Sequence, residues 1–233
     1  GEMKAALHAG IPAEQMVFSG VGKRRDEIEA GIEAGILMFN LESPAELECV
    51  DEIAQRLGKR AGIAVRINPN INPQTHPKIS TGLSKNKFGI PTDQAIDLYR
   101  RAQHMPGVEI RGIACHIGSS LMDSGPLLEA CTLMLGLRKR LIDDGIPIPY
   151  LDLGGGLGIQ YHKEVTDSPQ RYGERLRERL GDFDGTLILE PGRSLVGNAG
   201  VLLSTVLYRK VNGERTFVIL DAGMNDLIRP AMY

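Results

Sequence analysis

The stretch YLDLGGGLGI at residues 150–159 decides the fold class, because a short apolar run ends there in three consecutive glycines. Tyr150–Leu153 has the length and composition of a buried strand, and glycines allow a sharp turn or a close approach of the backbone to a ligand. A second apolar run, Thr186–Leu189, ends in the polar cluster Glu190-Pro191-Gly192-Arg193. Polar and glycine-rich residues that follow the carboxyl ends of strands are typical of parallel sheets.

The same pattern extends upstream, where apolar runs alternate with amphipathic helical patterns. The strand candidates are Met16–Phe18, Ile36–Leu41, Ile63–Ile67, Val108–Cys115, Tyr150–Leu153 and Thr186–Leu189. Ser43-Pro44-Ala45-Glu46 predicts a capping box at the start of a helix that ends before Gly58. The other helix candidates are Arg24–Ala34, Thr92–His104, a stripe from Leu127 to Leu141, and Arg171–Leu180. This alternation predicts a parallel α/β sheet covered by helices.

The polar clusters favour a barrel over an open sheet. An open doubly wound sheet concentrates its ligand contacts at one switch point, whereas a (β/α)8 barrel collects them from many strand ends. Most predicted strands here end in such a cluster; these are residues 19–23, 66–68, 116–119, 154–156 and 190–193. Barrels often bind phosphate through the loops after strands 7 and 8, which matches the last two clusters, 154–156 and 190–193. Counted back from these, the six strands are numbers 3 to 8. We therefore expect a TIM barrel that lacks its first two strands, in a piece of a longer protein truncated at both ends.

The pattern changes after Gly200, which predicts a second domain. Val201–Val211 and Arg215–Leu220 are both strand-like, and Asn212-Gly213 between them is a strong hairpin signal. We predict a barrel domain over residues 1–198 and the start of an antiparallel β-domain over 199–233. The stretch from Asn68 to Gly89 is long and rich in polar residues, and is predicted to be a functional loop.

The composition excludes several classes of protein. The 233 residues are 42% hydrophobic and carry a net charge of −2, which is typical of a globular protein and argues against nucleic acid or anionic membrane as the main partner. No apolar run reaches the length of a membrane span and no signal peptide is expected. The three cysteines form no CxxC pair, as expected of free thiols in a cytoplasmic protein. We expect no metal site.

Three clusters could carry chemistry, and each also has a purely structural interpretation. Gly154–Gly156 could present backbone N–H groups to a phosphate, or simply form a tight turn; it matches neither the P-loop nor the dinucleotide fingerprint. Glu190 and Arg193 could form an internal ion pair, or could separately face a cationic ring nitrogen and an anionic group. His116 at a strand end, followed by Ser119, could be structural or could offer a stacking face beside a hydroxyl donor.

In this order, the three clusters resemble the fold-type III decarboxylases that depend on pyridoxal phosphate and share the alanine racemase-like barrel. Within that group, four further stretches are similar to the diaminopimelate decarboxylases, lyases of bacterial lysine biosynthesis. These stretches are VFSGVGK at 17–23, KFGI at 87–90, DAGM at 221–224 and RPAMY at 229–233. The resemblance covers the whole chain, and the last of these stretches selects the subfamily.

The resemblance implies a role for each matching residue and pyridoxal 5'-phosphate as the cofactor. His116 would stack on the pyridine ring, and Glu190 would keep the ring nitrogen protonated, which makes these the expected catalytic residues. The expected cofactor-binding residues are His116, Ser119, Gly154, Gly155, Gly156, Glu190, Pro191, Gly192 and Arg193. The expected substrate-binding residues are Arg193, Arg229 and Tyr233, because an arginine fork suits the distal carboxylate of meso-diaminopimelate.

Two parts of the family's active site are absent from this sequence. The Schiff-base lysine is expected upstream of Gly1, and the Cys-Glu pair that enters the partner subunit's site is expected beyond Tyr233. Lys23 and Lys87 lie in predicted loops and are interpreted as solvated or as neighbours of the phosphate. Ser120 departs from the family, which often has Gln there.

The alternatives belong to the same superfamily or to a different class of protein. An ornithine, arginine or carboxynorspermidine decarboxylase would bind a cationic substrate tail, which Arg229 disfavours. A non-catalytic homologue that binds the cofactor is the alternative outside enzymes. The resemblance also implies a cytoplasmic homodimer with active sites at the subunit interface.

Overall fold

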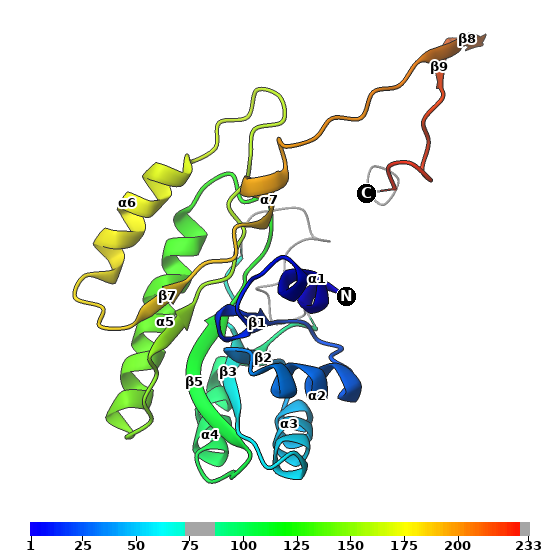
Figure 1. Ribbon diagram of the computed structural model, residues 1–233. Coiled ribbons are helices and arrows are strands. Elements are labelled where there is room, and N and C mark those ends of the chain that lie inside the picture. Colours follow the sequence, from blue (N-terminus) through cyan, green and yellow to red (C-terminus); the bar gives the residue numbers. More distant parts are fainter. Residues whose placement is uncertain (73–86, 229–233) are drawn as a thin grey trace. The chain divides into compact units, whose positions relative to one another are not determined.

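The computed structural model describes residues 1–72 and 87–228 (Figure 1). The chain divides into two compact units, Gly1–Ser194 and Leu195–Tyr233. The strands that begin in the first unit are β1 Val17–Phe18, β2 Met38–Leu41, β3 Ala61–Asn68, β4 Ile90–Pro91, β5 Val108–Cys115, β6 Tyr150–Asp152 and β7 Thr186–Ile188. The helices that begin there are α1 Glu2–His8, a 3-10 turn at Ala13–Gln15, α2 Arg25–Ala34, α3 Pro44–Arg56, α4 Thr92–Ala102, α5 Gly125–Asp143, α6 Pro169–Leu180 and α7 Gly192–Val196.

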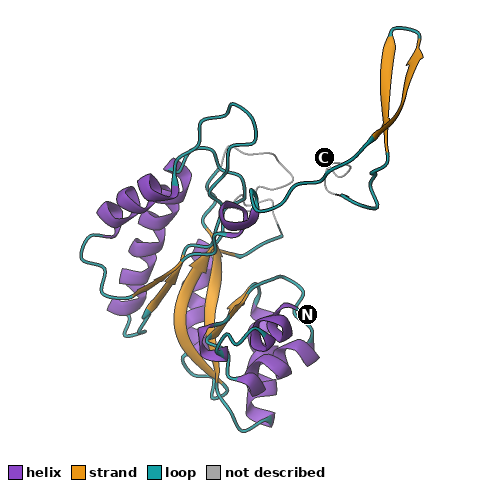
Figure 2. Ribbon diagram, turned by 45° about the horizontal axis from the view of Figure 1, so that its top comes forward, coloured by secondary structure: helices purple, strands orange, loops and turns teal. Residues whose placement is uncertain are grey.

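The sheet of the first unit is parallel and curled. Its hydrogen-bonded path is β1-β2-β3-β5-β6-β7, with β4 paired to β3, and every pair is parallel. Ser19, directly after β1, lies 3.4 Å from the carboxylate of Glu190, which follows β7 at the other end of this path. The strands therefore curve toward each other at their carboxyl ends, and Figure 2 shows the curled sheet in a tilted view. This curvature confirms the predicted barrel architecture and excludes an open sheet with one switch point.

The two faces of the sheet form two separate apolar cores. Phe39, Val65 and Ile113 point outward and pack against the helices that surround the sheet in Figure 1. Met38, Ala64 and Ala114 point to the inner face and form a second, smaller cluster that is almost completely buried. Because side chains alternate along a strand, neighbouring residues in the sequence are sorted into these two cores.

The predicted elements are confirmed, with shifted ends. Ser43 caps α3 as predicted, since its hydroxyl accepts a hydrogen bond from the Glu46 N–H at 3.2 Å. The Glu46 carboxylate does not complete the capping box but accepts from the Glu42 N–H at 2.7 Å. Ile90–Pro91 is a short strand that the sequence prediction missed, because only two residues pair. Most of the predicted loop between Asn68 and Gly89 lies outside the described residues.

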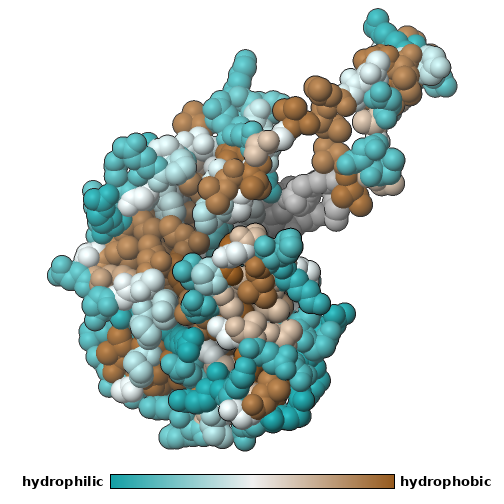
Figure 3. Space-filling view, in the orientation of Figure 1, coloured by the Kyte–Doolittle hydropathy of each residue, from teal (hydrophilic) through white to brown (hydrophobic). Residues whose placement is uncertain are grey.

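The second unit contains the predicted hairpin. Its strands, β8 Val206–Asn212 and β9 Arg215–Leu220, are antiparallel, and Asn212 pairs with Arg215. The turn is therefore Gly213-Glu214, one residue later than predicted, with Gly213 at a φ of +58°. The hairpin exposes many large side chains, which include Val206, Tyr208, Val211, Phe217 and Val218. Figure 3 shows brown, hydrophobic atoms on this unit.

Candidate active site

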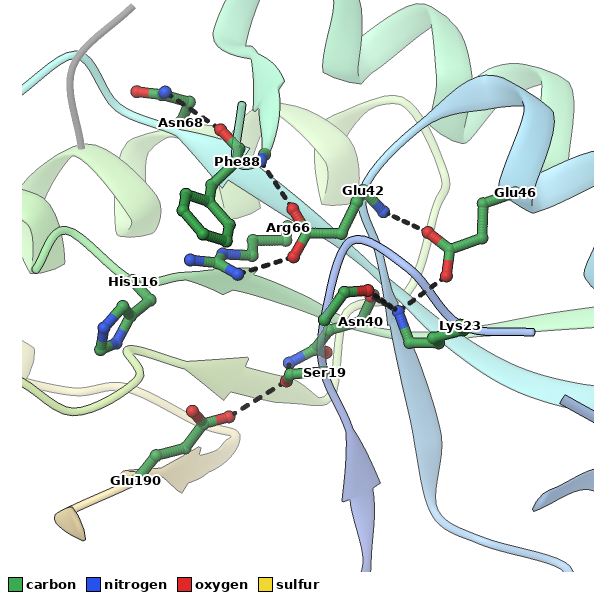
Figure 4. A network of polar contacts seen from close by, with 12 residues as sticks. Ser19, Lys23, Asn40, Glu42, Glu46, Arg66, Asn68, Phe88, His116 and Glu190 are labelled. Carbon is green, nitrogen blue, oxygen red and sulfur yellow. Dashed lines mark hydrogen bonds and ion pairs between the residues drawn. The ribbon is translucent and has the colours of Figure 1, made fainter. Parts of the chain in front are cut away.

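Polar side chains gather on the inner face of the sheet, directly beyond its apolar cluster. Two residues after Met38 stands Asn40, and two residues after Ala64 stands Arg66, so both side chains continue on the same face. Figure 4 shows them with Ser19, His116 and Glu190 at the carboxyl ends of their strands. Together with Ala114 and Cys115, these five residues line a pocket of about 100 Å³.

Two carboxylates face each other in this layer. Asp152, on β6, is fully buried and accepts hydrogen bonds from the Asn40 amide and from the Gly154 N–H, both at 2.8 Å. Glu190 is the more exposed of the two, and its carboxyl group accepts from Ser19. Burial of the carboxyl group and the neighbouring Asp152 raise the pKa of Glu190 to about 7. Burial also raises the pKa of Asp152. The pair therefore holds a proton near neutral pH.

His116 is a neutral imidazole at the edge of the pocket. Its Nδ1 accepts a hydrogen bond from the Gly155 N–H at 3.1 Å, so this nitrogen is unprotonated. Burial, together with the positive charge of Arg66, lowers the pKa of His116 to about 4. An uncharged ring with a fixed orientation is suited to stacking on a flat aromatic ligand.

The three glycines are required by close packing. A Cβ on Gly154 would lie 2.7 Å from both the Cys115 carbonyl oxygen and the His116 ring, and one on Gly155 would collide with the Glu190 carbonyl. Gly156 has a φ of +122°, and a Cβ there would lie 2.7 Å from the carbonyl oxygen of Gly118. The N–H groups of Gly154 and Gly155 already donate to Asp152 and His116. The glycine run therefore fixes two site residues and lies against the loop that contains Ser119.

Arg66 is the buried cation of the site. Its guanidinium donates to Glu42 at 2.6 Å, and the two side chains are only 9% and 3% exposed. The other Glu42 oxygen accepts from the Gly89 N–H at 2.7 Å, and the Phe88 ring lies 5.0 Å from the guanidinium. A buried ion pair is stabilising only when its remaining polar atoms also form hydrogen bonds. Here the Gly89 N–H satisfies the second oxygen of Glu42.

The interpretation of Lys23 as solvated is wrong. Its side chain is 1% exposed, and its ammonium donates to the Glu46 carboxylate and to the carbonyl oxygens of Gly20 and Asn40, at 2.7–2.8 Å. These three acceptors use all three of its hydrogens. Lys23 therefore ties the loop after β1 to the end of β2 and to α3. Lys87, in contrast, is exposed.

Arg193 and Glu190 do not form the internal ion pair of the structural interpretation. Within residues 1–72 and 87–228 no ion pair joins them; Arg193 instead donates to the Tyr161 hydroxyl at 3.1 Å. Arg229 and Tyr233, the remaining predicted substrate residues, lie outside the described residues. Gly192 begins the short helix α7, directly after the exposed Pro191.

The site residues fit pyridoxal phosphate. Asn40 Oδ1 is a buried acceptor without a partner in the described part of the chain, and Asn40 lines the pocket. Such an atom indicates that the pocket receives a hydrogen-bond donor from a bound molecule. Glu190 supplies an acceptor for a protonated ring nitrogen, and His116 supplies an aromatic face. These two acceptors and the ring face therefore suit a cationic aromatic ring.

Sequence reasoning missed four members of this layer as site residues: Ser19, Asn40, Arg66 and Asp152. Asn40 and Asp152 are single polar residues within apolar strand runs, in MFNL and YLDL, and Arg66 stands between apolar residues in AVRIN. A polar residue inside a buried parallel strand is unusual, because such strands are apolar on both faces. That signal was available from the sequence.

Comparison with known proteins places this geometry in a family. The model of the pyridoxal binding domain of pyridoxal-dependent decarboxylases matches residues 1–197. Diaminopimelate decarboxylases from Pseudomonas aeruginosa and Aquifex aeolicus are 49% and 47% identical over the whole chain, which covers 56% of each. The chain thus spans about half the length of the curated relatives it matches.

A solved structure shares the fold closely. Diaminopimelate decarboxylase from Helicobacter pylori, complexed with L-lysine, aligns over the whole chain and 59% of its own length, with a TM-score of 0.96 and 44% identity. Lysine decarboxylase from Selenomonas ruminantium aligns with a TM-score of 0.86 and 26% identity. No helix in the described part of the chain is long and apolar enough to cross a membrane. From the match over residues 1–197 and the arrangement of its polar layer, the chain belongs to the family of pyridoxal-dependent decarboxylases.

Proposed function

We propose that this chain acts within a longer diaminopimelate decarboxylase, which converts meso-diaminopimelate to L-lysine and CO2. The observation that carries the proposal is the proton-holding pair of Glu190 and Asp152 beside the neutral His116. The relatives named as diaminopimelate decarboxylases support the choice of substrate, since they are 45–49% identical to the chain over its whole length. The similarity to lysine decarboxylases is weaker, at 25–26% identity.

When bound, pyridoxal phosphate supplies an electron sink for the electron pair left behind as a carboxylate departs as CO2. Glu190 would hold a proton at the ring nitrogen, and His116 would hold the ring face. Ser119, Gly156 and Arg193 would hold the phosphate, with Gly154, Gly155, Pro191 and Gly192 shaping the loops around it. Arg193, Arg229 and Tyr233 would hold the substrate.

The proposal includes the organisation of the whole protein. Residues 1–198 form the cofactor-binding barrel and 199–233 begin a β-domain, which the two compact units and the end of the family match at residue 197 support. The lysine that carries the cofactor and the Cys-Glu pair would come from segments outside this chain. The protein would act in the cytoplasm as a homodimer with its active sites at the subunit interface.

Substrate preference tests the proposal. The full-length protein, supplied with pyridoxal phosphate, should release CO2 from meso-diaminopimelate with a kcat/KM at least about a hundredfold above that for L-lysine, L-ornithine or L-arginine. Arg229→Ala should lower kcat/KM for diaminopimelate by roughly two to three orders of magnitude, since a charged contact in a closed site is worth about 2–5 kcal/mol. Its cofactor absorbance should not change. Preference for a substrate with a cationic tail would contradict the subfamily, and failure to bind pyridoxal phosphate would contradict the whole proposal.

A further inference from the structure

Asn40 connects the two carboxylates of the polar layer. It lies on β2 and is 2% exposed. One hydrogen of its amide is donated to Asp152 Oδ2 at 2.8 Å, and the other to the Ser19 hydroxyl at 2.9 Å. The two acceptors come from β6 and from the loop after β1, which are far apart in the sequence. A single carboxamide therefore spans the inner face of the sheet.

Ser19 extends this connection to Glu190. Its hydroxyl accepts from Asn40 and lies 3.4 Å from Glu190 Oε1, to which it donates. A hydroxyl has one hydrogen, so the bond from Asn40 leaves that hydrogen for Glu190. Asn40 thus contacts Asp152 directly and Glu190 through one intervening group.

The amide of Asn40 has only one acceptable orientation. If it were turned over, its oxygen would face the Asp152 carboxylate, and two acceptors would oppose each other. The backbone carbonyl of Asn40 is held as well, by the buried ammonium of Lys23 at 2.7 Å. The orientation leaves Oδ1 without a partner among the described residues, although it is buried. Leaving a buried acceptor unpaired is unfavourable, so the two hydrogen bonds that the Asn40 amide donates, and not its oxygen, set its orientation.

We propose that Asn40 is a positioning residue that sets Asp152 and Glu190 for the protonated ring nitrogen of pyridoxal phosphate. It keeps Asp152 ionised by donating to it, and the Asp152 charge in turn keeps a proton on Glu190. This inference rests on the proposed function and adds to it a residue that controls where the proton of the pair resides. Arg66, His116 and Cys115 are the other charged or titratable groups that line the pocket, and the positive charge of Arg66 lowers the pKa of both carboxyl groups.

Two substitutions have opposite expected effects on Glu190. Asn40→Leu removes both donors, so Asp152 takes up the proton and the pKa of Glu190 should fall by at least one unit from about 7. Ser19→Ala removes the one hydrogen bond that favours ionised Glu190, so its pKa should rise. Met38→Ala lies on the same strand and face but changes an apolar side chain that donates no hydrogen bond to either carboxylate, and serves as the control for a general loss of stability.

The titration is measured by carbon NMR of the side-chain carboxyl groups in the full-length protein without cofactor. Cofactor affinity, followed by absorbance, should weaken about tenfold or more in Asn40→Leu and less than twofold in Met38→Ala. If Asn40→Leu does not fold, Asn40→Ala, which removes the same two donors, is titrated in its place, and Ser19→Ala reports only on the bond between Ser19 and Glu190. An unchanged Glu190 titration in the folded Asn40 variant would overturn the proposal. The titration needs no cofactor. Failure to bind pyridoxal phosphate would therefore overturn the proposed function, whereas the Glu190 titration could still be measured and would test Asn40 separately.

Discussion

The inner face of the curled sheet contains two layers that differ sharply, although the same strands build both. The first layer is apolar, with Met38, Ala64 and Ala114 almost fully buried. The second begins two residues further along each strand and contains Asn40 and Arg66, with further polar residues from the neighbouring strands. Residues two apart along a strand point to the same face of the sheet and differ only in their position along the strand. The strands thus provide stability at one end and chemistry at the other.

The two layers are stabilised by different interactions. The apolar layer gains from area removed from water, which needs no particular orientation of its side chains. Each charge in the polar layer instead depends on specific partners, as Arg66 does on Glu42 and Lys23 on Glu46. Removal of one partner should therefore cost more in the polar layer than truncation does in the apolar layer.

The largest expected effect is that of Arg66→Met. It leaves the Glu42 carboxylate buried without its cation, and breaking a buried pair typically costs about 3–5 kcal/mol. Urea denaturation of the full-length protein should show a loss of this size in the free energy of unfolding.

The matched control is Arg25→Met, which breaks a pair with Glu52 of similar length whose side chains are 57% and 64% exposed. It should cost at most about 1 kcal/mol. A double variant, Arg66→Met with Glu42→Leu, should recover part of the stability lost by the single one. Equal losses in the free energy of unfolding for Arg66→Met and Arg25→Met would contradict the claim that the buried ion pair of the site is worth more than the exposed pair on the surface.

A somewhat smaller effect is expected of Met38→Ala. It opens a cavity among Ala64, Ala114 and their neighbours and should cost about 2–4 kcal/mol of unfolding free energy. The affinity for pyridoxal phosphate should stay within twofold of the unsubstituted protein, because no polar contact is lost. A large loss of affinity at unchanged stability would show that the two layers are not separable.

The smallest effect is a pH dependence of stability. The pKa of Glu190 is raised to about 7 in the folded protein from its ordinary 4.5, so the folded state binds the extra proton between these values. Stability of the cofactor-free protein should therefore decrease through this group as the pH rises from about 5 to 7.

Glu190→Gln removes the pH-dependent contribution of Glu190 to the free energy of unfolding. The stability of this variant relative to the unsubstituted protein should therefore increase as the pH rises. We expect a gain of about 1 kcal/mol from pH 5 to 8, less than the full shift implies because Glu190 is partly exposed. Thermal melts of both proteins across this range measure it, and the contribution of His116 cancels in the difference. Parallel curves would contradict the raised pKa of Glu190.

The sequence predicted the strands and the barrel because β-branched runs and polar strand ends depend on local patterns. It predicted His116, Glu190 and the glycine run as candidates because these follow the strands, where their residue types are conspicuous, and the structure places His116 and Glu190 at the pocket. Asn40 and Asp152 were not predicted, although each is a polar residue within an apolar strand run, because the apolar pattern does not show which face of a covered parallel strand points inward. Lys23 was misjudged for a related reason, since a loop position in the sequence does not reveal that the chain folds over its ammonium.

The central claim is that the polar layer of the inner face holds the pyridine ring of the cofactor. A crystal structure of the full-length protein with pyridoxal phosphate tests it most directly. The account predicts the ring nitrogen within hydrogen-bond distance of the Glu190 carboxylate and the ring face against His116. A cofactor bound away from these residues, with Glu190 still held only by Ser19 and Asp152, would contradict it.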